Sequence, residues 1–232
     1  MILMATVHDP SGQLLSLCDG LGEKLQQLFS EVYLCVSDVT HQEVIHQLSN
    51  QFKRVKVIPK NGAADARRQV LSYALTTKQS PCNLMYCDFD RIITWLDTNP
   101  KELYQLVNHK EKMDYMIVGR TTKAFSTHPL SWQETERVTN FVASKFFDIE
   151  NLDATAGAAI LSDEVGKLIN DKSIHTHTDC EWPKIVVDNG GRLSHIKVDG
   201  LSFDTVNVSN ITSNDHYTER LKLSLNILAI FH

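Results

Sequence analysis

Two acidic residues separated by one position, Asp88 and Asp90, follow a short apolar run, Leu84 to Cys87. The run is apolar without alternation and short, which favours a buried strand over a helix. Carboxylates at the end of a buried strand are costly unless a partner offsets their charge. If the chain stays extended, both side chains lie on the same side and can bind one divalent cation, which could also hold a diphosphate. The alternative is a pair of solvated acids where the strand leaves the sheet.

A second group of possible metal ligands alternates with other residues near position 180: His175, His177, Asp179 and Glu181. In an extended segment all four would lie on one side, and imidazole and carboxylate groups are usual metal ligands. The competing interpretation is a polar loop that leads into a helix, whose N-terminus favours acidic residues. For the two histidines we favour the loop.

With 42% apolar and 22% charged residues, the composition supports a full core in a soluble protein. The length of 232 residues fits one large domain or two small ones, and the absence of repeats and low-complexity linkers favours a single continuous domain, residues 1–232. A net charge of −5 provides no field for binding nucleic acid or an anionic membrane. We expect no membrane insertion, because no apolar run approaches a membrane span, and Met1 to Val7 lacks the basic start of a signal peptide. Five cysteines without a Cys-x-x-Cys pair indicate reduced thiols in a cytoplasmic protein.

The first ninety-odd residues alternate between apolar strands and amphipathic helices. The predicted strands are Ile2 to Val7, Val32 to Val36, Val55 to Ile58 and Leu84 to Cys87; the predicted helices are Leu14 to Phe29, one capped by Thr40, and Ala63 to Leu75. This alternation predicts a Rossmann-type, mostly parallel sheet with helices on both faces.

Polar residues follow each of these four strands. In parallel sheets, ligands bind beyond the carboxyl ends of the strands. We therefore expect one edge of the sheet to carry four polar segments: His8-Asp9, Ser37-Asp38, Lys60-Asn61-Gly62 and Asp88 to Asp90. Convergence of four strand ends is stronger evidence for a ligand site than any one of these segments.

The second half of the chain is less regular. We predict strands at Tyr115 to Val118, Ala158 to Leu161, Leu193 to Val198 and Leu201 to Phe203, with a turn at Asp199-Gly200 between the last two. We predict helices at Ser131 to Phe147, at Trp182 to Val187 with Pro183 in its first turn, and from a cap at Ser213 or Asn214 to Phe231. Arg120, Lys123 and His128 follow the fifth strand and could bind a phosphate or an anionic acceptor. The alternative is a solvated polar loop.

Other phosphate-handling folds lack their signatures here. No Gly-x-Gly-x-x-Gly follows the first strand and no P-loop is present, which argues against a dehydrogenase or a P-loop enzyme. A HAD-type phosphatase also uses Asp-x-Asp at a strand end. Its motif normally lies on the first strand, whereas this one follows the fourth and precedes Arg91-Ile92-Ile93.

The order of the motifs resembles that of GT-A glycosyltransferases of the broad family-2 group. The resemblance rests on Asp38 after an early strand, Asn61-Gly62 through Ala66-Arg67, Asp88-Phe89-Asp90, Gly157 to Leu161, and Asp179-Cys180-Glu181-Trp182 ahead of Gly190. It covers nearly the whole chain in order, although each motif alone is weak. It implies metal-dependent transfer of a sugar from a UDP- or GDP-linked donor to an unidentified acceptor. A catalytically silent protein that binds a nucleotide sugar is the alternative.

The resemblance also implies roles for individual residues. Residues 1–95 would bind the donor and 96–232 the acceptor; the implied donor-binding residues are His8, Asp9, Asp38, Asn61, Arg67 and Asp88, with Mn²⁺ or Mg²⁺ bound by Asp88 and Asp90. Asp38 would contact the nucleobase.

The resemblance places Asp179 or Glu181 beside the acceptor as a catalytic residue. In an inverting enzyme one of these carboxylates takes the proton of the acceptor hydroxyl, whereas a retaining enzyme needs no base there. Cys180 interrupts the usual Glu-Asp-Trp order, which leaves open which acid acts. His195 and His216 are further candidates for a third metal ligand.

Overall fold

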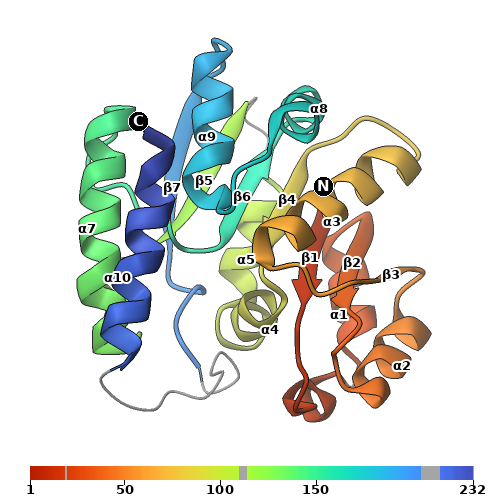
Figure 1. The fold of residues 1–232 in the computed structure, drawn as a ribbon. Coiled ribbons are helices and arrows are strands. Elements are labelled where there is room, and N and C mark those ends of the chain that lie inside the picture. Colours follow the sequence, from red (N-terminus) through yellow and green to blue (C-terminus); the bar gives the residue numbers. More distant parts are fainter. Residues whose placement is uncertain (19, 110–113, 205–214, 232) are drawn as a thin grey trace.

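Seven strands form one sheet in the computed structural model, which describes residues 1–18, 20–109, 114–204 and 215–231. The strands are β1 (Ile2–Val7), β2 (Glu31–Ser37), β3 (Arg54–Ile58), β4 (Leu84–Cys87), β5 (Tyr115–Arg120), β6 (Ala158–Leu161) and β7 (Leu193–Val198). Their order across the sheet is β3-β2-β1-β4-β6-β5-β7 (Figure 1). All of the strands predicted between residues 2 and 198 are confirmed.

The sheet is parallel except at β6. Strands β1 to β4 pair in parallel, and β5 pairs in parallel with β7. Strand β6 runs antiparallel between β4 and β5. Six strands therefore end at one edge of the sheet, and β6 begins there, which confirms the mostly parallel α/β architecture.

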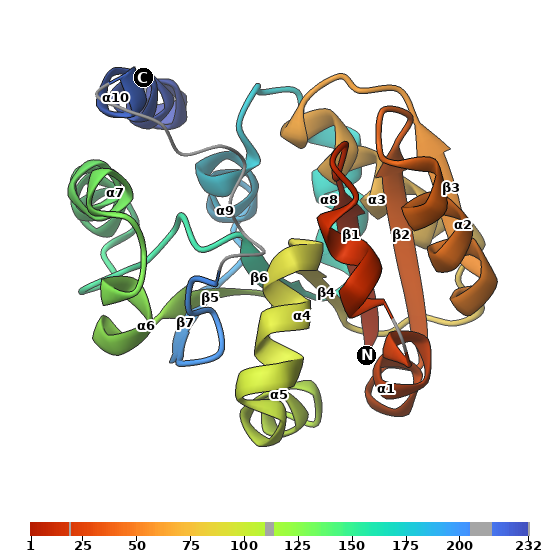
Figure 2. The same cartoon turned by 90° about the horizontal axis from the view of Figure 1, so that it is seen from below.

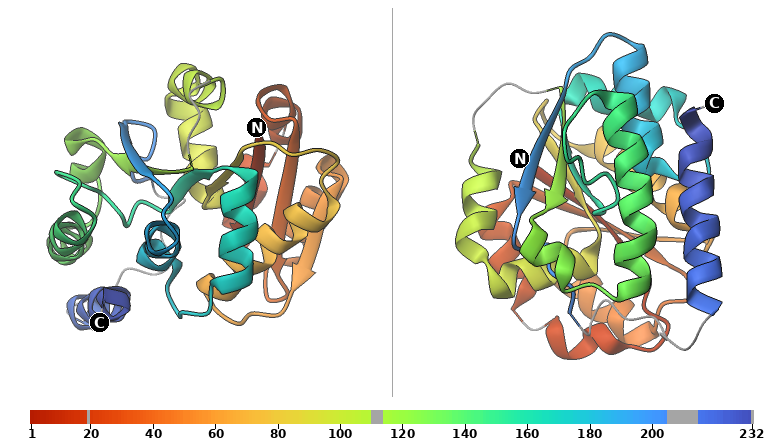
Figure 3. Two further views of the ribbon diagram at one scale, coloured as in Figure 1. Left: turned by 90° about the horizontal axis from the view of Figure 1, so that it is seen from above. Right: turned by 90° about the vertical axis from the view of Figure 1, so that its left-hand side faces the viewer.

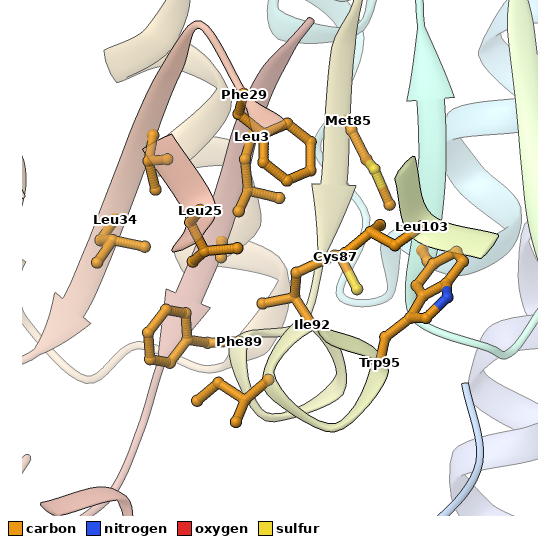
Figure 4. Packing of buried hydrophobic residues seen from close by; sticks show 14 of the residues in the cluster. Leu3, Leu25, Phe29, Leu34, Met85, Cys87, Phe89, Ile92, Trp95 and Leu103 are labelled. Carbon is orange, nitrogen blue, oxygen red and sulfur yellow. The ribbon is translucent and has the colours of Figure 1, made fainter. Parts of the chain in front are cut away.

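Helices cover both faces, because successive residues along each buried strand point to opposite sides. One face packs against α1 (Leu21–Leu28), α2 (Gln42–Gln51), α4 (Phe89–Thr98) and α5 (Pro100–Val107), and the other against α3 (Ala63–Thr77), α8 (Asp163–Lys172) and α9 (Thr178–Asp188) (Figure 2). Figure 4 shows the first of these cores, where Leu3 and Met85 of the sheet meet Leu25, Phe89 and Trp95.

Two long helices stand outside this sandwich, beside the β5–β7 end of the sheet. Helix α7 (Leu130–Phe147) packs along α10 (Asp215–Leu228), and α10 also contacts α9 (Figure 3). A short helix, α6 (Thr122–Ser126), follows β5. None of the described helices combines the length and apolarity that crossing a bilayer requires.

The predicted helix from Leu14 to Phe29 is wrong, because the segment forms two separate elements. A 3₁₀ helix, η1 (Gln13–Leu17), precedes α1, and Gly20 between them has a left-handed φ of 66°. The cap of α2 is His41 rather than Thr40, because His41 Nδ1 accepts a hydrogen bond from the backbone N–H of Glu43. The predicted caps Ser213 and Asn214 lie outside the described residues.

Two predictions in the second half also need correction. The segment Leu201 to Phe203 is not a strand, since Glu102 of α5 accepts hydrogen bonds from the backbone N–H groups of Asp199 and Gly200 and holds the chain against α5 instead. Helix α9 begins at Thr178, four residues before the predicted start, so Pro183 lies beyond its first turn.

Candidate active site

The chain is not extended at Asp88 and Asp90, so the condition for both side chains to lie on one side of a strand is not met. Helix α4 begins immediately after β4, with Asp88 as its cap and Asp90 in its first turn. The Asp88 backbone N–H donates to the carbonyl oxygen of Gly157 at the start of β6, at 3.1 Å. Gly157 has a φ of 73°, and a Cβ there would lie 2.4 Å from Asp88 Oδ2. The glycine thus leaves room for the carboxylate where β4 and β6 meet.

Arg67 of α3 binds both ends of the candidate site. Its Nη2 lies 3.3 Å from each carboxylate oxygen of Asp88, and its Nη1 donates to Asp179 Oδ1 and to Thr178 Oγ1, each at 3.0 Å. Burial acts against its charge, but Asp179, Tyr86 and Asp88 raise the pKa of Arg67 well above its ordinary value. Arg67 therefore stays charged and fixes the two aspartates on opposite sides of one guanidinium.

Tyr86 completes this cluster from β4. Its hydroxyl donates to Asp88 Oδ1 and accepts from Arg67 Nε at 3.0 Å. Burial and the charge of Asp88 raise the pKa of Tyr86 well above its ordinary value, so the hydroxyl keeps its proton. Asp88 is consequently held by a neutral donor and a cation together.

A cavity of about 310 Å³ opens beside these residues. Its wall includes Asp88, Asp90 and Arg91 of the β4–α4 junction, Arg67 of α3, His177 just before α9 and Thr178 and Asp179 in its first turn, Trp132, Glu136 and Thr139 of α7, and Arg220, Leu223, Ser224 and Ile227 of α10. Residues from both halves of the chain therefore share one space.

Only one of the two candidate catalytic acids faces this cavity. Asp179 lines it, next to Arg67. Glu181 is buried below it, and its carboxylate accepts hydrogen bonds from Ser173 Oγ and from the N–H groups of Ile174 and His175, at 2.5 to 2.6 Å. Glu181 thus ties the preceding loop to α9, while Asp179 is placed to meet a ligand.

The predicted donor-binding residues follow β1, β2 and β3. His8 Nδ1 and Ser37 Oγ are 2.9 Å apart, and the exposed Asp38 accepts a hydrogen bond from the Lys60 N–H at 3.1 Å. Asp9 is buried and accepts from the N–H groups of Gln13 and Leu14, so it holds η1 in place.

The neighbouring donor-side positions remain open to solvent. Asn61 is exposed at the turn before α3. Burial lowers the pKa of His8, so its imidazole is neutral near pH 7.

The basic residues at and after the end of β5 do not form the anion site that the sequence offered as one of two interpretations. Arg120 is enclosed by carboxylates: its side chain donates to both oxygens of Asp153 at 2.8 Å and to Glu136 at 2.6 Å. Lys123 is exposed and pairs with Asp199. Burial, Arg120 and Arg91 lower the pKa of His128 to about 3, so this ring is neutral.

Several residues that shape this region were not predicted from the sequence. Asp153 and Glu136 bind Arg120 from 33 and 16 positions away in the sequence. Trp132 and Arg220 line the cavity from α7 and α10. Neither spacing nor a local motif marks any of them; only the fold brings them together.

The candidate histidines differ in their surroundings. His177 lines the cavity, and burial lowers its pKa. His175 Nδ1 accepts from the N–H of His177 at 3.2 Å, which fits the loop interpretation. His195 lies on β7 with its Nε2 3.4 Å from the Asp153 N–H, away from the cavity wall. The side chain of His216 lies outside the described part of the structure.

Asp88 and Asp90 fit a metal that binds together with a substrate. Among the described residues, no group of three or more His, Cys, Asp or Glu side chains is placed to hold a metal ion. Mg²⁺ is commonly bound by one or two carboxylates together with phosphate oxygens of the substrate. Two carboxylates on the wall of an open cavity match that arrangement.

Crystal structures of glucosyl-3-phosphoglycerate synthase from Mycobacterium tuberculosis are similar to this chain. Its complex with Mn²⁺, UDP-glucose and phosphoglyceric acid has a TM-score of 0.62 at 10% sequence identity, covering 99% of this chain and 79% of that chain. Its complex with Mg²⁺ and UDP has a TM-score of 0.57, with the same identity and coverage. The chain has a GT-A-type fold.

The GT-A-type fold is what this similarity establishes, because 10% identity carries no information on substrates. No protein-family model matches the sequence, and no curated protein sequence matches it significantly. The activity must therefore be argued from the cavity at the edge of the GT-A-type sheet.

Proposed function

We propose that this protein transfers a sugar from a UDP- or GDP-linked donor to an acceptor hydroxyl, with Mn²⁺ or Mg²⁺ as cofactor. The observation that carries the proposal is that Asp88, Asp90 and Asp179, from both halves of the chain, line one cavity beyond the carboxyl end of β4. Ligands of open α/β sheets bind at this edge. The structurally similar synthase was crystallised with Mn²⁺, UDP-glucose and phosphoglyceric acid.

In this proposal, residues 1–95 bind the donor nucleotide and residues 96–232 the acceptor. Asp38, exposed beyond β2, is the partner for the nucleobase. His8 and Asn61 flank it at the ends of β1 and β3, and Asp9 shapes the loop by holding η1. The diphosphate then reaches Asp88 and Asp90 at the end of β4, the strand next to β1.

A bound Mn²⁺ or Mg²⁺ would act as a Lewis acid that neutralises charge on the departing nucleoside diphosphate. Arg67 holds the Asp88 carboxylate beside Gly157 and also anchors Asp179. Asp179 is the general base of an inverting reaction, because it lines the cavity and Glu181 does not. In a retaining reaction, Asp179 would orient the acceptor without accepting its proton.

Calorimetric titration tests this proposal directly. UDP, GDP and their sugar conjugates are titrated into the protein with and without Mn²⁺. We expect one of the nucleotides to bind in a Mn²⁺-dependent manner, and Asp90→Ala to abolish that dependence while the circular dichroism spectrum stays unchanged. Absence of nucleotide binding under all of these conditions would rule the proposal out.

One observation favours a second candidate, a catalytically silent protein that binds a nucleotide sugar. Asp88 already has a cation, Arg67, and a hydroxyl donor, Tyr86, so this carboxylate is satisfied without a metal. The two candidates differ in turnover. Slow Mn²⁺-dependent hydrolysis of the bound donor sugar indicates an enzyme, and binding without hydrolysis or transfer indicates the silent protein.

A further inference from the structure

We infer that Arg91, Trp132 and Arg220 form an anion subsite that binds a carboxylate or phosphate group of the acceptor. The inference extends the proposed function, because it names the chemical class of the second substrate. These three residues come from α4, α7 and α10 and together form one wall of the cavity. We call them the anion wall.

In the anion wall, two guanidinium groups lie over one indole ring. The guanidinium carbon of Arg220 lies 4.3 Å, and that of Arg91 5.9 Å, from the centre of the Trp132 ring. Stacking on an aromatic face holds a guanidinium in place and leaves its N–H groups available at its edge, in the plane of the guanidinium. The wall is thus preorganised by residues from three helices.

Hydrogen-bond donors in this wall lack acceptors. Within the described structure, Arg220 Nε and Trp132 Nε1 are buried without a hydrogen-bond partner. Arg91 donates its Nη1 to the neutral ring of His128, at 2.8 Å. Guanidinium and indole groups can only donate, so their complement is a group that only accepts, such as a carboxylate or a phosphate.

The charge around the wall is also incomplete. Glu136 forms ion pairs with both Arg120 and Arg220, and Asp153 forms an ion pair with Arg120. Burial lowers the pKa of Arg220, and repulsion from Arg120 and Arg91 adds to this, although Glu136 and Asp179 oppose it. An anion beside Arg220 and Arg91 would supply the missing negative charge.

Trp132 and Arg220 assign this anion to the acceptor rather than to the donor, while Arg91 reaches the wall from the first turn of α4, next to Asp90. The donor half lies on the β1–β3 side of Asp88, whereas α7 and α10 stand beyond β6 and β5 on the opposite side (Figure 3). Asp179, the candidate base, lines the same cavity as the anion wall. An anionic group bound there would leave a neighbouring hydroxyl of the same molecule facing Asp179.

Sulfate is a suitable probe, because it carries two charges, resembles a phosphate ester and stays soluble with Mn²⁺. It is titrated by calorimetry into the free protein and into the protein saturated with UDP and Mn²⁺, with chloride at equal ionic strength as the reference. We expect sulfate to bind in both states. Binding to the free protein alone would overturn the acceptor assignment, since the donor diphosphate would then occupy the wall.

Two variants link binding to the wall. Arg220→Gln should weaken sulfate binding about tenfold or more through loss of a charge-assisted contact, and should leave UDP binding within about twofold. Trp132→Phe keeps an aromatic ring but removes the N–H donor, and should weaken sulfate binding severalfold. Arg192→Gln is the control, because Arg192 is exposed and lies outside the cavity.

Unchanged sulfate affinity in both Arg220→Gln and Trp132→Phe would overturn the inference. If Arg220→Gln fails to fold, Trp132→Phe alone still tests the inference. Loss of UDP affinity with unchanged sulfate affinity in Arg220→Gln would overturn it as well. Sulfate binding by a protein that binds no nucleotide would instead contradict the proposed function and leave the anion wall supported.

Discussion

Arg67 bridges to Asp88, with its Nη2 3.3 Å from both oxygens of that carboxylate. The pair joins helix α3 to the end of β4, at the position where the sequence indicated a metal ligand. A guanidinium and a divalent cation that share one carboxylate repel each other. Arg67 therefore stabilises Asp88 without metal and must loosen its contact when Asp88 binds one.

Arg67→Met removes the cation from this cluster. We expect the free energy of unfolding to fall by about 2 to 3 kcal/mol, because two largely buried carboxylates lose their partner. Mn²⁺ should then raise the melting temperature of the variant more than that of the wild type, since it replaces the lost charge. Scanning calorimetry with and without Mn²⁺ measures both effects. Equal stabilisation of the two proteins by Mn²⁺ would contradict competition at Asp88.

Gly157→Ala tests the close approach between β6 and Asp88. The new Cβ would lie 2.4 Å from Asp88 Oδ2, so the carboxylate must move and Mn²⁺-dependent nucleotide binding should weaken about tenfold or more. Gly190→Ala is a matched control, because Gly190 also has a left-handed φ, 79°, but nothing lies within 4 Å of its added Cβ. Calorimetry that finds the same nucleotide affinity in both variants would contradict the steric role of Gly157.

Asp179 and Glu181 should respond to neutralisation in opposite ways. Glu181→Gln removes a buried charge that accepts three hydrogen bonds, so urea unfolding should show a loss of about 2 kcal/mol with nucleotide affinity retained. Asp179→Asn should keep nucleotide affinity but lower the rate of sugar transfer. A larger loss of transfer rate in Glu181→Gln than in Asp179→Asn would reverse our assignment of the base.

The parallel strands and their polar ends were predictable from the sequence, because short apolar runs that end in acids leave few alternatives. The run Leu84 to Cys87 predicts β4, and the carboxyl-end rule placed Asp38 and Asp88 at one edge. The helix after Asp88 was missed although its signal is present. Phe89, Ile92, Ile93 and Leu96 recur at helical spacing and pack on the sheet.

The acceptor side was not predictable, because its contacts join residues from separate elements. Arg120 ends β5, where the sequence allowed an open anion site, but Asp153 and Glu136 neutralise it in the fold. Arg220 and Trp132 meet only because α10 packs along α7. No local pattern encodes either arrangement.

The Arg120–Asp153 pair should make stability depend on pH at the acid end. Burial disfavours the Asp153 carboxylate, but the charge and hydrogen bonds of Arg120 outweigh it and lower the pKa to about 2. The unfolded chain therefore binds the proton first, and about 2 kcal/mol of stability, present above pH ~4, is lost as the pH falls towards ~2. The free energies of unfolding of the wild type and of Asp153→Asn, measured with urea, should converge as the pH falls over this range. A gap that stays constant with pH would contradict the ion pair.

In the proposed reaction, a divalent cation binds at Asp88 and Asp90 together with a nucleoside diphosphate. Anomalous diffraction from crystals soaked with Mn²⁺ and UDP measures this directly. We predict one anomalous peak within coordination distance of an oxygen of Asp90 or Asp88, with the diphosphate of UDP on its other side. Ordered UDP without a peak at these two carboxylates, or Mn²⁺ bound elsewhere, would contradict the account.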